Sequence, residues 1–170
     1  MNKKTLNIVI SAMFAAIVCI ATIVIVIPSP LKGYINLGDS VVLLSGWILS
    51  PAYGFLAAGI GSALADLYAG YITYIPATFI IKGTMAAVAH KVFGSMSKKY
   101  SRLGSRIISG IFAEIIMVLG YYVFEGFLYG FIASAVNIPV NMVQGGAGLI
   151  IGTLIINIIT KSHILSNFNN

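Results

Sequence analysis

Apolar residues fill this sequence in long stretches that are separated by short breaks rich in proline, glycine and serine. The first stretch runs from Leu6 to Ile27 and ends at Pro28. Because about 20 apolar residues form a helix that crosses a bilayer core, this length predicts a spanning helix rather than the shorter hydrophobic part of a cleavable signal peptide. Only 8% of the residues are charged, against about 25% in a typical soluble domain. The composition therefore excludes a soluble enzyme.

The breaks divide the chain into six apolar segments. These lie near residues 5–27, 38–49, 52–70, 75–93, 105–130 and 138–160. The predicted fold is an all-α membrane protein in which residues 1–170 form a single domain of six transmembrane helices. The second segment is short for a span, so we expect it to be tilted or to extend into the loop before it.

The basic residues predict how these helices are oriented in the membrane. If the N-terminus is cytoplasmic, the lysines and arginines on the cytoplasmic side are Lys3, Lys4, Lys91, Lys98, Lys99, Arg102, Arg106 and Lys161. Only Lys32 then falls on the outer side. This bias follows the positive-inside rule and places both termini in the cytoplasm. The net charge of +6 is thus a topology signal, and no nucleic-acid partner is expected.

Ionisable side chains inside the predicted spans are the strongest indication of function. The four acidic residues Asp39, Asp66, Glu114 and Glu125 all lie in or at the ends of the predicted spans, and Lys82 lies within one. A charge at the centre of a span costs about 2.5–3.5 kcal/mol on insertion scales, so each of these residues is a functional candidate. Glu114 lies near the middle of its helix, and no role is assigned to it.

Most of these polar groups are predicted to share one depth in the outer half of the membrane. At about 1.5 Å per helical residue, those within the helices lie about 5–10 Å below the outer helix ends. The predicted set is Tyr34, Asn36, Asp39, Asp66, Tyr74, Lys82, Tyr121, Tyr122, Glu125, Asn141 and Gln144. Carboxylates, amides and phenols in apolar surroundings suit a small polar heteroaromatic ligand. A structural alternative is a buried Asp66–Lys82 ion pair with an interfacial tyrosine belt.

No catalytic or nucleotide-binding motif accompanies these residues. The sequence contains neither HExxH, nor GxSxG, nor a phosphate-binding GxxxxGK loop. We therefore expect no enzymatic activity, no metal ion and no cofactor. A carrier without a nucleotide-binding loop is either passive or ion-coupled, or it takes its energy from a partner.

Four stretches of the sequence carry a family resemblance. They are Gly33-Tyr34-Ile35-Asn36-Leu37-Gly38-Asp39, Gly61 to Leu67, Pro76 to Gly83 and Ile138 to Gly145. Together they resemble the S components, the substrate-binding membrane subunits of energy-coupling factor (ECF) transporters. The resemblance implies a six-helix vitamin receptor whose site lies near the outer face, with the first outer loop helping to close it.

The resemblance also implies partners. In the family an Ala-x-x-x-Ala motif of the first helix docks on a transmembrane coupling subunit, and Ala12 and Ala16 match this motif. The coupling subunit binds two cytoplasmic ATPases, and transport is thought to involve toppling of the S component within the membrane. These partners, the lipid bilayer and a small vitamin are the expected binding partners of the chain.

The subgroup that the sequence most resembles carries pyridoxine or hydroxymethylpyrimidine, with riboflavin carriers as near relatives. Glu125, Asn141 and Gln144 suit a small hydroxylated pyridine or pyrimidine. Two other functions stay open. A self-sufficient, proton-coupled secondary transporter would use Asp66, Glu114 and Glu125 as a relay, although the sequence has no clear internal repeat of the kind often seen in such carriers. A membrane protein with a structural role would bind no ligand.

Overall fold

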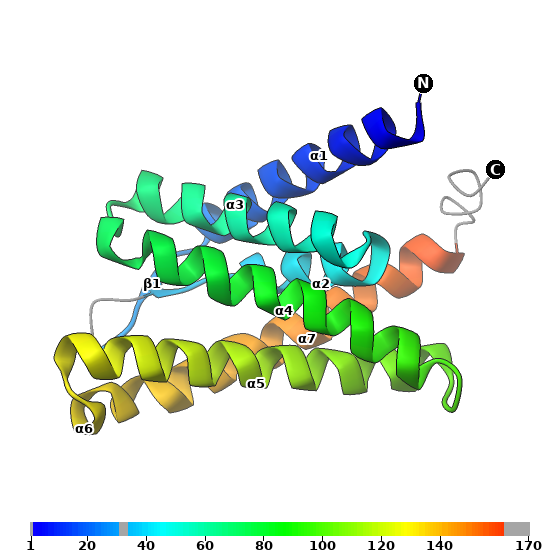
Figure 1. Ribbon diagram of the computed structural model, residues 1–170. Coiled ribbons are helices and arrows are strands. Elements are labelled where there is room, and N and C mark those ends of the chain that lie inside the picture. Colours follow the sequence, from blue (N-terminus) through cyan, green and yellow to red (C-terminus); the bar gives the residue numbers. More distant parts are fainter. Residues whose placement is uncertain (1, 31–33, 162–170) are drawn as a thin grey trace.

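A computed structural model describes residues 2–30 and 34–161, and within them the fold is all-α apart from one two-stranded ribbon (Figure 1). The long helices are α1 (Lys3–Val24), α2 (Gly38–Ile48), α3 (Pro51–Ala69), α4 (Ile75–Met96), α5 (Arg102–Tyr129) and α7 (Ile138–Lys161). The short elements are the antiparallel strands β1 (Ile27–Pro28) and β2 (Tyr34–Ile35), the 3-10 turns η1 (Ile72–Tyr74) and η2 (Ala135–Asn137), and helix α6 (Phe131–Ser134). Lys32, expected on the outer side, lies outside the described residues.

Proline and glycine set several helix ends where the sequence predicts breaks. Pro51 and Pro76 each lie in the first turn of a helix, α3 and α4 respectively, where the missing N–H removes no helical hydrogen bond. Gly70 and Gly130 follow the last residues of α3 and α5 with φ angles of 82° and 90°, which glycine adopts without steric strain. Ser101 caps α5 by accepting a backbone hydrogen bond. The predicted order of long helices is confirmed.

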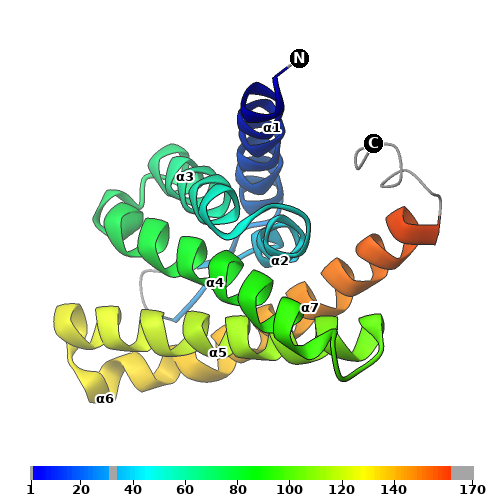
Figure 2. The ribbon, with the colours of Figure 1, turned by 45° about the vertical axis from the view of Figure 1, so that its right-hand side comes forward.

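Helix α2 lies at the centre of the bundle, and this position explains its short length. It packs against α1, α3, α4 and α7, which surround it in Figure 2. Every residue from Gly38 to Trp47 is buried. An apolar helix this short is typical of a buried core rather than of a membrane span. The neighbouring helices thus provide its apolar surroundings, and the predicted tilt of this helix in the membrane stays a prediction.

Four helical stretches of the described chain are long and apolar enough to cross a membrane. They are Lys3–Val24, Ile72–Met96, Arg102–Tyr129 and Phe131–Lys161. Helices α2 and α3 are not among them, so the count of six spans stays a prediction, as does the cytoplasmic location of the termini. Helix α1 begins and α7 ends at the same end of the bundle as the α4–α5 connection (Figure 1). This arrangement is compatible with the predicted orientation.

The bundle exposes apolar side chains and buries charged ones. Phe127 and Ile132 are 80% and 94% exposed, whereas Asp39 and Lys82 are 0% and 3% exposed. Helix α1 lies at the edge of the bundle (Figure 2) and presents exposed side chains such as Met13 along its outer face. Apolar surface of this extent marks contact with lipid or with another protein. The polar interior is therefore where a function in ligand binding must be sought.

Candidate functional site

A small polar cavity is lined by residues next to β1, from β2 and the α3–α4 turn, and from the adjoining parts of α1, α3, α4, α5 and α7. In Figure 1, β1 and the α3–α4 turn lie at the end of the bundle opposite the two termini. Its volume is about 30 Å³, which has room for ordered water but is far below the roughly 300–1,000 Å³ of typical ligand pockets. The lining residues are Thr22, Ser29, Tyr34, Asn36, Ser62, Asp66, Tyr71, Tyr74, Thr78, Lys82, Tyr121, Glu125, Asn141 and Gln144. Segments that are far apart in the sequence thus contribute polar groups to one place.

One wall of the cavity is built around the buried carboxylate of Asp39. This residue lies in the first turn of α2, where it accepts hydrogen bonds from Lys82 Nζ of α4 and, at 2.6 Å, from Gln144 Nε2 of α7. Gln144 Oε1 in turn accepts a hydrogen bond from the backbone N–H of Asn36 at 3.0 Å. Asp39 does not line the cavity itself, but its hydrogen bonds fix the positions of Lys82 and Gln144, which line the cavity.

A close approach of two helices allows this arrangement. A Cβ atom placed on Gly148 of α7 would lie 2.7 Å from the Cβ of Asp39. That separation is far shorter than a van der Waals contact between carbon atoms, so only glycine fits at this position of α7. The absence of a side chain lets α7 bring Gln144, one turn earlier, within reach of the Asp39 carboxylate.

The predicted ion pair between Asp66 and Lys82 is wrong, because the acidic partner of Lys82 is a different residue. Lys82 pairs with Asp39, whereas Asp66, in the last turn of α3, accepts a 2.7 Å hydrogen bond from the hydroxyl of Tyr34. Asp39 lies in the buried first turn of α2, beside α4, and Asp66 lies nearer to strand β2. Depth along the helices places all three residues at a similar level but cannot decide which side chains face each other.

Tyr34 connects the loop before α2 to this cluster. Burial, with a smaller contribution from the neighbouring Asp66 carboxylate, raises the pKa of the Tyr34 hydroxyl. The hydroxyl therefore keeps its proton at neutral pH and donates a hydrogen bond to the Asp66 carboxylate. The Tyr34 ring lies 4.8 Å from the ring of Tyr71, which meets the ring of Tyr74 edge-on at 6.1 Å. Three tyrosines thus form an aromatic wall beside the polar groups.

Another part of the lining is built around the carboxylate of Glu125 on α5. Asn137 Nδ2 donates to both of its oxygens, at 3.0 and 2.9 Å, and the hydroxyl of Tyr74 donates to Oε1 at 3.3 Å. Asn137 lies in η2, where the chain folds back from α6 towards α7. The sequence analysis missed this residue because it falls in the break before Pro139. The sequence feature that could have indicated Asn137 is its position as an amide directly before the start of an apolar helix.

Nine of the polar residues predicted to share one depth line the cavity. They are Tyr34, Asn36, Asp66, Tyr74, Lys82, Tyr121, Glu125, Asn141 and Gln144. The sequence analysis did not predict the contributions of Thr22, Ser29, Ser62, Tyr71 and Thr78, which are small or lie next to helix ends. Thr78 has a clear role, since its hydroxyl lies 3.1 Å from that of Tyr121. Hydroxyl groups of this kind cost little to bury when they are paired, so they carry a weak sequence signal.

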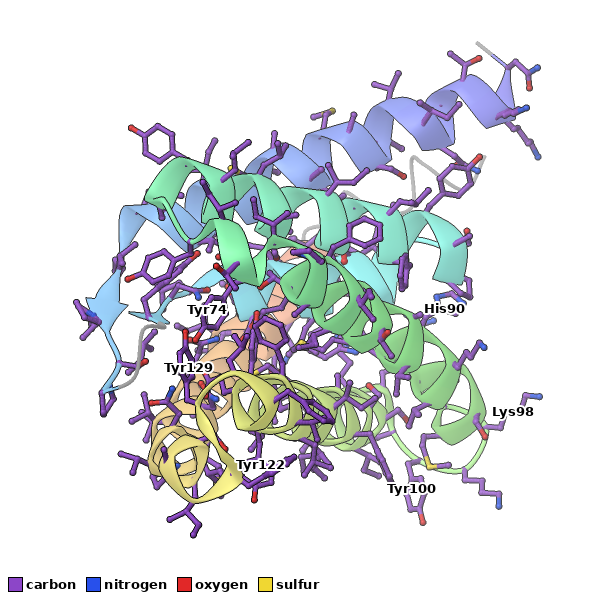
Figure 3. All side chains as sticks on the ribbon, turned by 60° about the vertical axis from the view of Figure 1, so that its left-hand side comes forward. Tyr74, His90, Lys98, Tyr100, Tyr122 and Tyr129 are labelled. Atoms are coloured by element: carbon purple, nitrogen blue, oxygen red, sulfur yellow. The ribbon has the colours of Figure 1, made fainter. Side chains whose placement is uncertain are left out.

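The structure places Tyr122 away from the cavity. Its ring packs against Phe131 at 5.7 Å, and Figure 3 shows it apart from Tyr74 and Tyr129. Successive residues of a helix point about 100° apart, so Tyr121 and Tyr122 cannot both face the same site. Tyr121 is the one that turns inward, where its ring lies 5.4 Å from Lys82 Nζ.

A second, larger hollow lies beside the polar cavity. It has a volume of about 340 Å³ and is lined by Gly70, Tyr71, Ile72, Thr73, Tyr74 and Tyr129. Tyr74 and Tyr129 lie close together at this end of the molecule in Figure 3. Because Tyr71 and Tyr74 line both spaces, these two side chains separate the polar cavity from the outer hollow.

Two remaining predictions concern Glu114 and the α1 motif. Glu114 is 8% exposed, faces Gly145 of α7, and neither of its oxygens has a hydrogen-bond partner in the described chain. Ala12 and Ala16 are exposed on the outer face of α1, whereas Ala15 faces the bundle. The alanine pair is thus free of contacts that would block a partner helix, and its role in docking stays a prediction.

Comparison with known proteins identifies the family. Residues 2–161 match the family described as ECF-type riboflavin transporter, S component. An uncharacterised protein of Pyrococcus woesei, from the gap 3' region, is 35% identical over 136 residues, which cover 79% of this chain and 88% of that protein. The thiamine precursor transporter HmpT of Lactococcus lactis subsp. cremoris (strain MG1363) is 23% identical over 142 residues, which cover 84% of this chain and 79% of HmpT.

A solved structure supports the same fold. The S component of a bacterial ECF transporter superposes with a TM-score of 0.67 over 99% of both chains, at 21% sequence identity. Because the superposition covers 99% of this chain, it includes helices α1 to α5 and α7, and thus also the buried helix α2. Together, the family match and the apolar helices show that the chain is a multi-pass membrane protein that belongs to the S component family of ECF-type riboflavin transporters.

Proposed function

We propose that this S component captures a small vitamin or vitamin precursor in the polar cavity and delivers it to an ATPase-driven coupling module. The observation that carries the proposal is the convergence of Lys82, Glu125, Asn141 and Gln144 on one cavity. These residues come from α4, α5 and α7. A ligand site is typically an enclosed space with a few placed polar groups and aromatic walls, and this cavity has that composition.

The chemistry of the lining favours a nitrogen-containing heteroaromatic ring with hydroxyl groups. Asn141 and Gln144 supply amide groups that pair with ring nitrogens or hydroxyls, and Glu125 accepts hydrogen bonds from hydroxyl or amino groups. The rings of Tyr71 and Tyr74 offer flat surfaces against which such a ring stacks. The preferred ligands are therefore pyridoxine and hydroxymethylpyrimidine. A thiamine precursor is the substrate named for the relative HmpT. Hydroxymethylpyrimidine contains the pyrimidine ring of thiamine and is therefore a candidate of that kind.

Riboflavin is the second candidate, and the family match favours it, since residues 2–161 match the S components of riboflavin transporters. Its larger ring system needs more space than a pyridine or pyrimidine. The polar cavity of about 30 Å³ takes neither ring without movement. Rotation of Tyr71 and Tyr74 would join it to the adjoining hollow of about 340 Å³, which lies within the usual range of roughly 300–1,000 Å³ for ligand pockets.

The proton-coupled alternative receives less support from the arrangement of the acidic groups. Asp66 is hydrogen-bonded to Tyr34, Glu125 is hydrogen-bonded to Asn137 and Tyr74, and Glu114 has no hydrogen-bond partner in the described chain. A relay needs neighbouring groups that exchange protons directly or through water. Here the three carboxyl groups lie in separate hydrogen-bond environments.

Equilibrium binding of a vitamin panel to the purified full-length chain tests the proposal. We expect saturable binding of pyridoxine or hydroxymethylpyrimidine, with riboflavin as the next compound in affinity. Glu125→Ala or Asn141→Ala should abolish this binding, while Tyr122→Phe, outside the cavity, should keep it. Saturable binding of no panel compound would reject the ligand class. Unchanged affinity in both alanine variants would reject the site.

A further inference from the structure

The end of the bundle opposite the polar cavity carries positive charge without matching acidic residues. Figure 3 shows Lys98 and Tyr100 at this end, far from Tyr74 and Tyr129. The sequence holds four acidic residues. Three of them, Asp39, Asp66 and Glu125, belong to the site already described, and Glu114 lies about three turns along α5 from Arg102 at its basic end. Within the described residues, the basic side chains here therefore have no side-chain carboxylate beside them to neutralise them.

Arg106 is the unusual member of this basic group because it is buried. It lies in the second turn of α5 and is 6% exposed. Its Nη1 donates to Asn157 Oδ1 at 2.7 Å and its Nη2 to Thr160 Oγ1 at 3.1 Å, both on α7. The guanidinium carbon lies 5.9 Å from the centre of the Phe93 ring of α4. Three helices thus fix the orientation of one cation.

All of the partners of Arg106 among the described residues are neutral. Its Nε is buried and has no hydrogen-bond partner in the described chain. A buried cation without an opposite charge is strongly unfavourable, because neither water nor a counter-ion compensates the loss of hydration. An arginine this close to a helix end would otherwise extend its head group towards water. The hydrogen bonds to α7 instead keep the guanidinium in place, as in a prepared anion site.

Arg102 completes the arrangement. It is exposed and lies four residues before Arg106, so both project from the same face of α5, and the two cations are close enough to repel each other. Lys161 adds a further positive charge at the last residue of α7. Two guanidinium groups, one held by α7 and one exposed, match the tetrahedral oxygens of a phosphate group, which arginine binds through paired hydrogen bonds.

We propose that Arg102 and Arg106 bind the phosphate of an anionic phospholipid headgroup at the basic end of the bundle. The helix ends of a spanning protein lie at the level of the headgroups, and basic pockets between helices on the cytoplasmic side are typical sites for acidic lipids. The headgroup supplies the negative charge that the described side chains lack at this end. This inference does not depend on the identity of the vitamin.

Lipid retention measured by native mass spectrometry tests the proposal. The full-length protein is reconstituted in nanodiscs containing phosphatidylglycerol and phosphatidylcholine, extracted in mild detergent, and analysed for bound lipid. We expect one phosphatidylglycerol per chain, favoured over phosphatidylcholine. Arg102→Gln and Arg106→Gln should each lower the retained fraction about tenfold, as expected for loss of a charge-assisted bond. Lys98→Gln removes an equal charge at the same end and should change retention less than twofold.

Several results would overturn the proposal. If the unchanged protein showed no preference for phosphatidylglycerol, an anionic lipid would be rejected as the ligand. If Lys98→Gln lowered lipid retention as much as the arginine variants do, the lipid would be held by diffuse surface attraction rather than by a site. Displacement of the lipid by millimolar inorganic phosphate would identify a free-anion site instead. A normal lipid count in Arg102→Gln and Arg106→Gln, with weaker binding of the coupling subunit, would identify an acidic protein partner. Arg102 is exposed, so its variant remains informative if Arg106→Gln fails to fold.

Discussion

Asp39 is a buried carboxylate that joins three helices of the bundle. It is fully buried, and it joins α2 to α4 through Lys82 and to α7 through Gln144. A buried ion pair contributes little net stability relative to apolar residues of the same shape, but removal of one partner leaves the other charge uncompensated. The stability of the bundle should therefore depend on Asp39 more than on the other acidic residues.

We expect Asp39→Asn to lower the free energy of unfolding by about 3–5 kcal/mol, because Lys82 loses its buried counter-ion. Thermal or denaturant unfolding of the purified protein in detergent measures this loss. Asp66→Asn is the matched control, since Asp66 pairs with the Tyr34 hydroxyl rather than with Lys82. A larger loss in Asp66→Asn than in Asp39→Asn would contradict the assignment of the ion pair.

Asn137 illustrates a residue that acts on the site from outside the cavity. Its amide donates to both oxygens of Glu125, and hydrogen bonds to a charged group contribute about 1.5–3 kcal/mol each. We expect Asn137→Ala to weaken vitamin binding roughly tenfold or more, because the carboxylate is no longer held in place. Isothermal titration with the ligand found in the panel measures the change. Asn137→Asp, which cannot donate to a carboxylate when ionised, should fail to rescue binding, and full affinity in Asn137→Ala would exclude the positioning role.

At the scale of the elements, the sequence predicts helix identity well and helix neighbours poorly. The breaks at Pro51, Gly70 and Gly130 fix helix ends because each acts through its own backbone conformation. Pairing across helices depends on rotation about each axis, which apolar spans encode weakly when lipid and core are equally hydrophobic. For this reason the depth of Lys82 was predictable and its partner was not.

The same distinction applies to the candidate site. Glu125, Asn141 and Gln144 were predictable because a polar side chain in a span stands out against its surroundings. Asn137 lies in a turn, where amides are common, and only the fold brings it back onto α5. Tyr121 and Tyr122 are equivalent in composition and depth, and only the rotation of α5 selects the first.

Helix α1 carries the element-scale prediction, which concerns docking. Ala12 and Ala16 leave a shallow strip on the exposed face of α1, and small residues four apart let another helix approach closely. We expect Ala12→Trp or Ala16→Trp to block vitamin uptake in cells that supply the coupling module, while binding by the purified chain is unchanged. Leu154→Trp, on an exposed face of α7, is the control. If uptake were normal in all three variants, the assignment of α1 as the docking surface would be rejected.

At the scale of the whole molecule, the two ends differ in charge and in role. The acidic residues gather in the middle and at the end that holds the polar cavity, whereas the opposite end is basic. From the positive-inside rule we expect the basic end to lie in the cytoplasm, so the end with the polar cavity would face the outer side, where the proposed vitamin would be captured. The orientation thus decides whether the cavity serves import.

Cysteine labelling in intact cells tests this orientation. Cys19 is the single cysteine of the chain, so Cys19→Ser gives a background without thiols. In that background, Thr73→Cys marks the exposed turn beside the cavity and Ser97→Cys marks the exposed α4–α5 end. We expect a membrane-impermeant maleimide to label Thr73→Cys in intact cells and Ser97→Cys only after the cells are permeabilised, because the lysines and arginines around Ser97 hold that end inside. The reverse pattern would place the cavity in the cytoplasm, and capture of a vitamin from outside would then have to be abandoned.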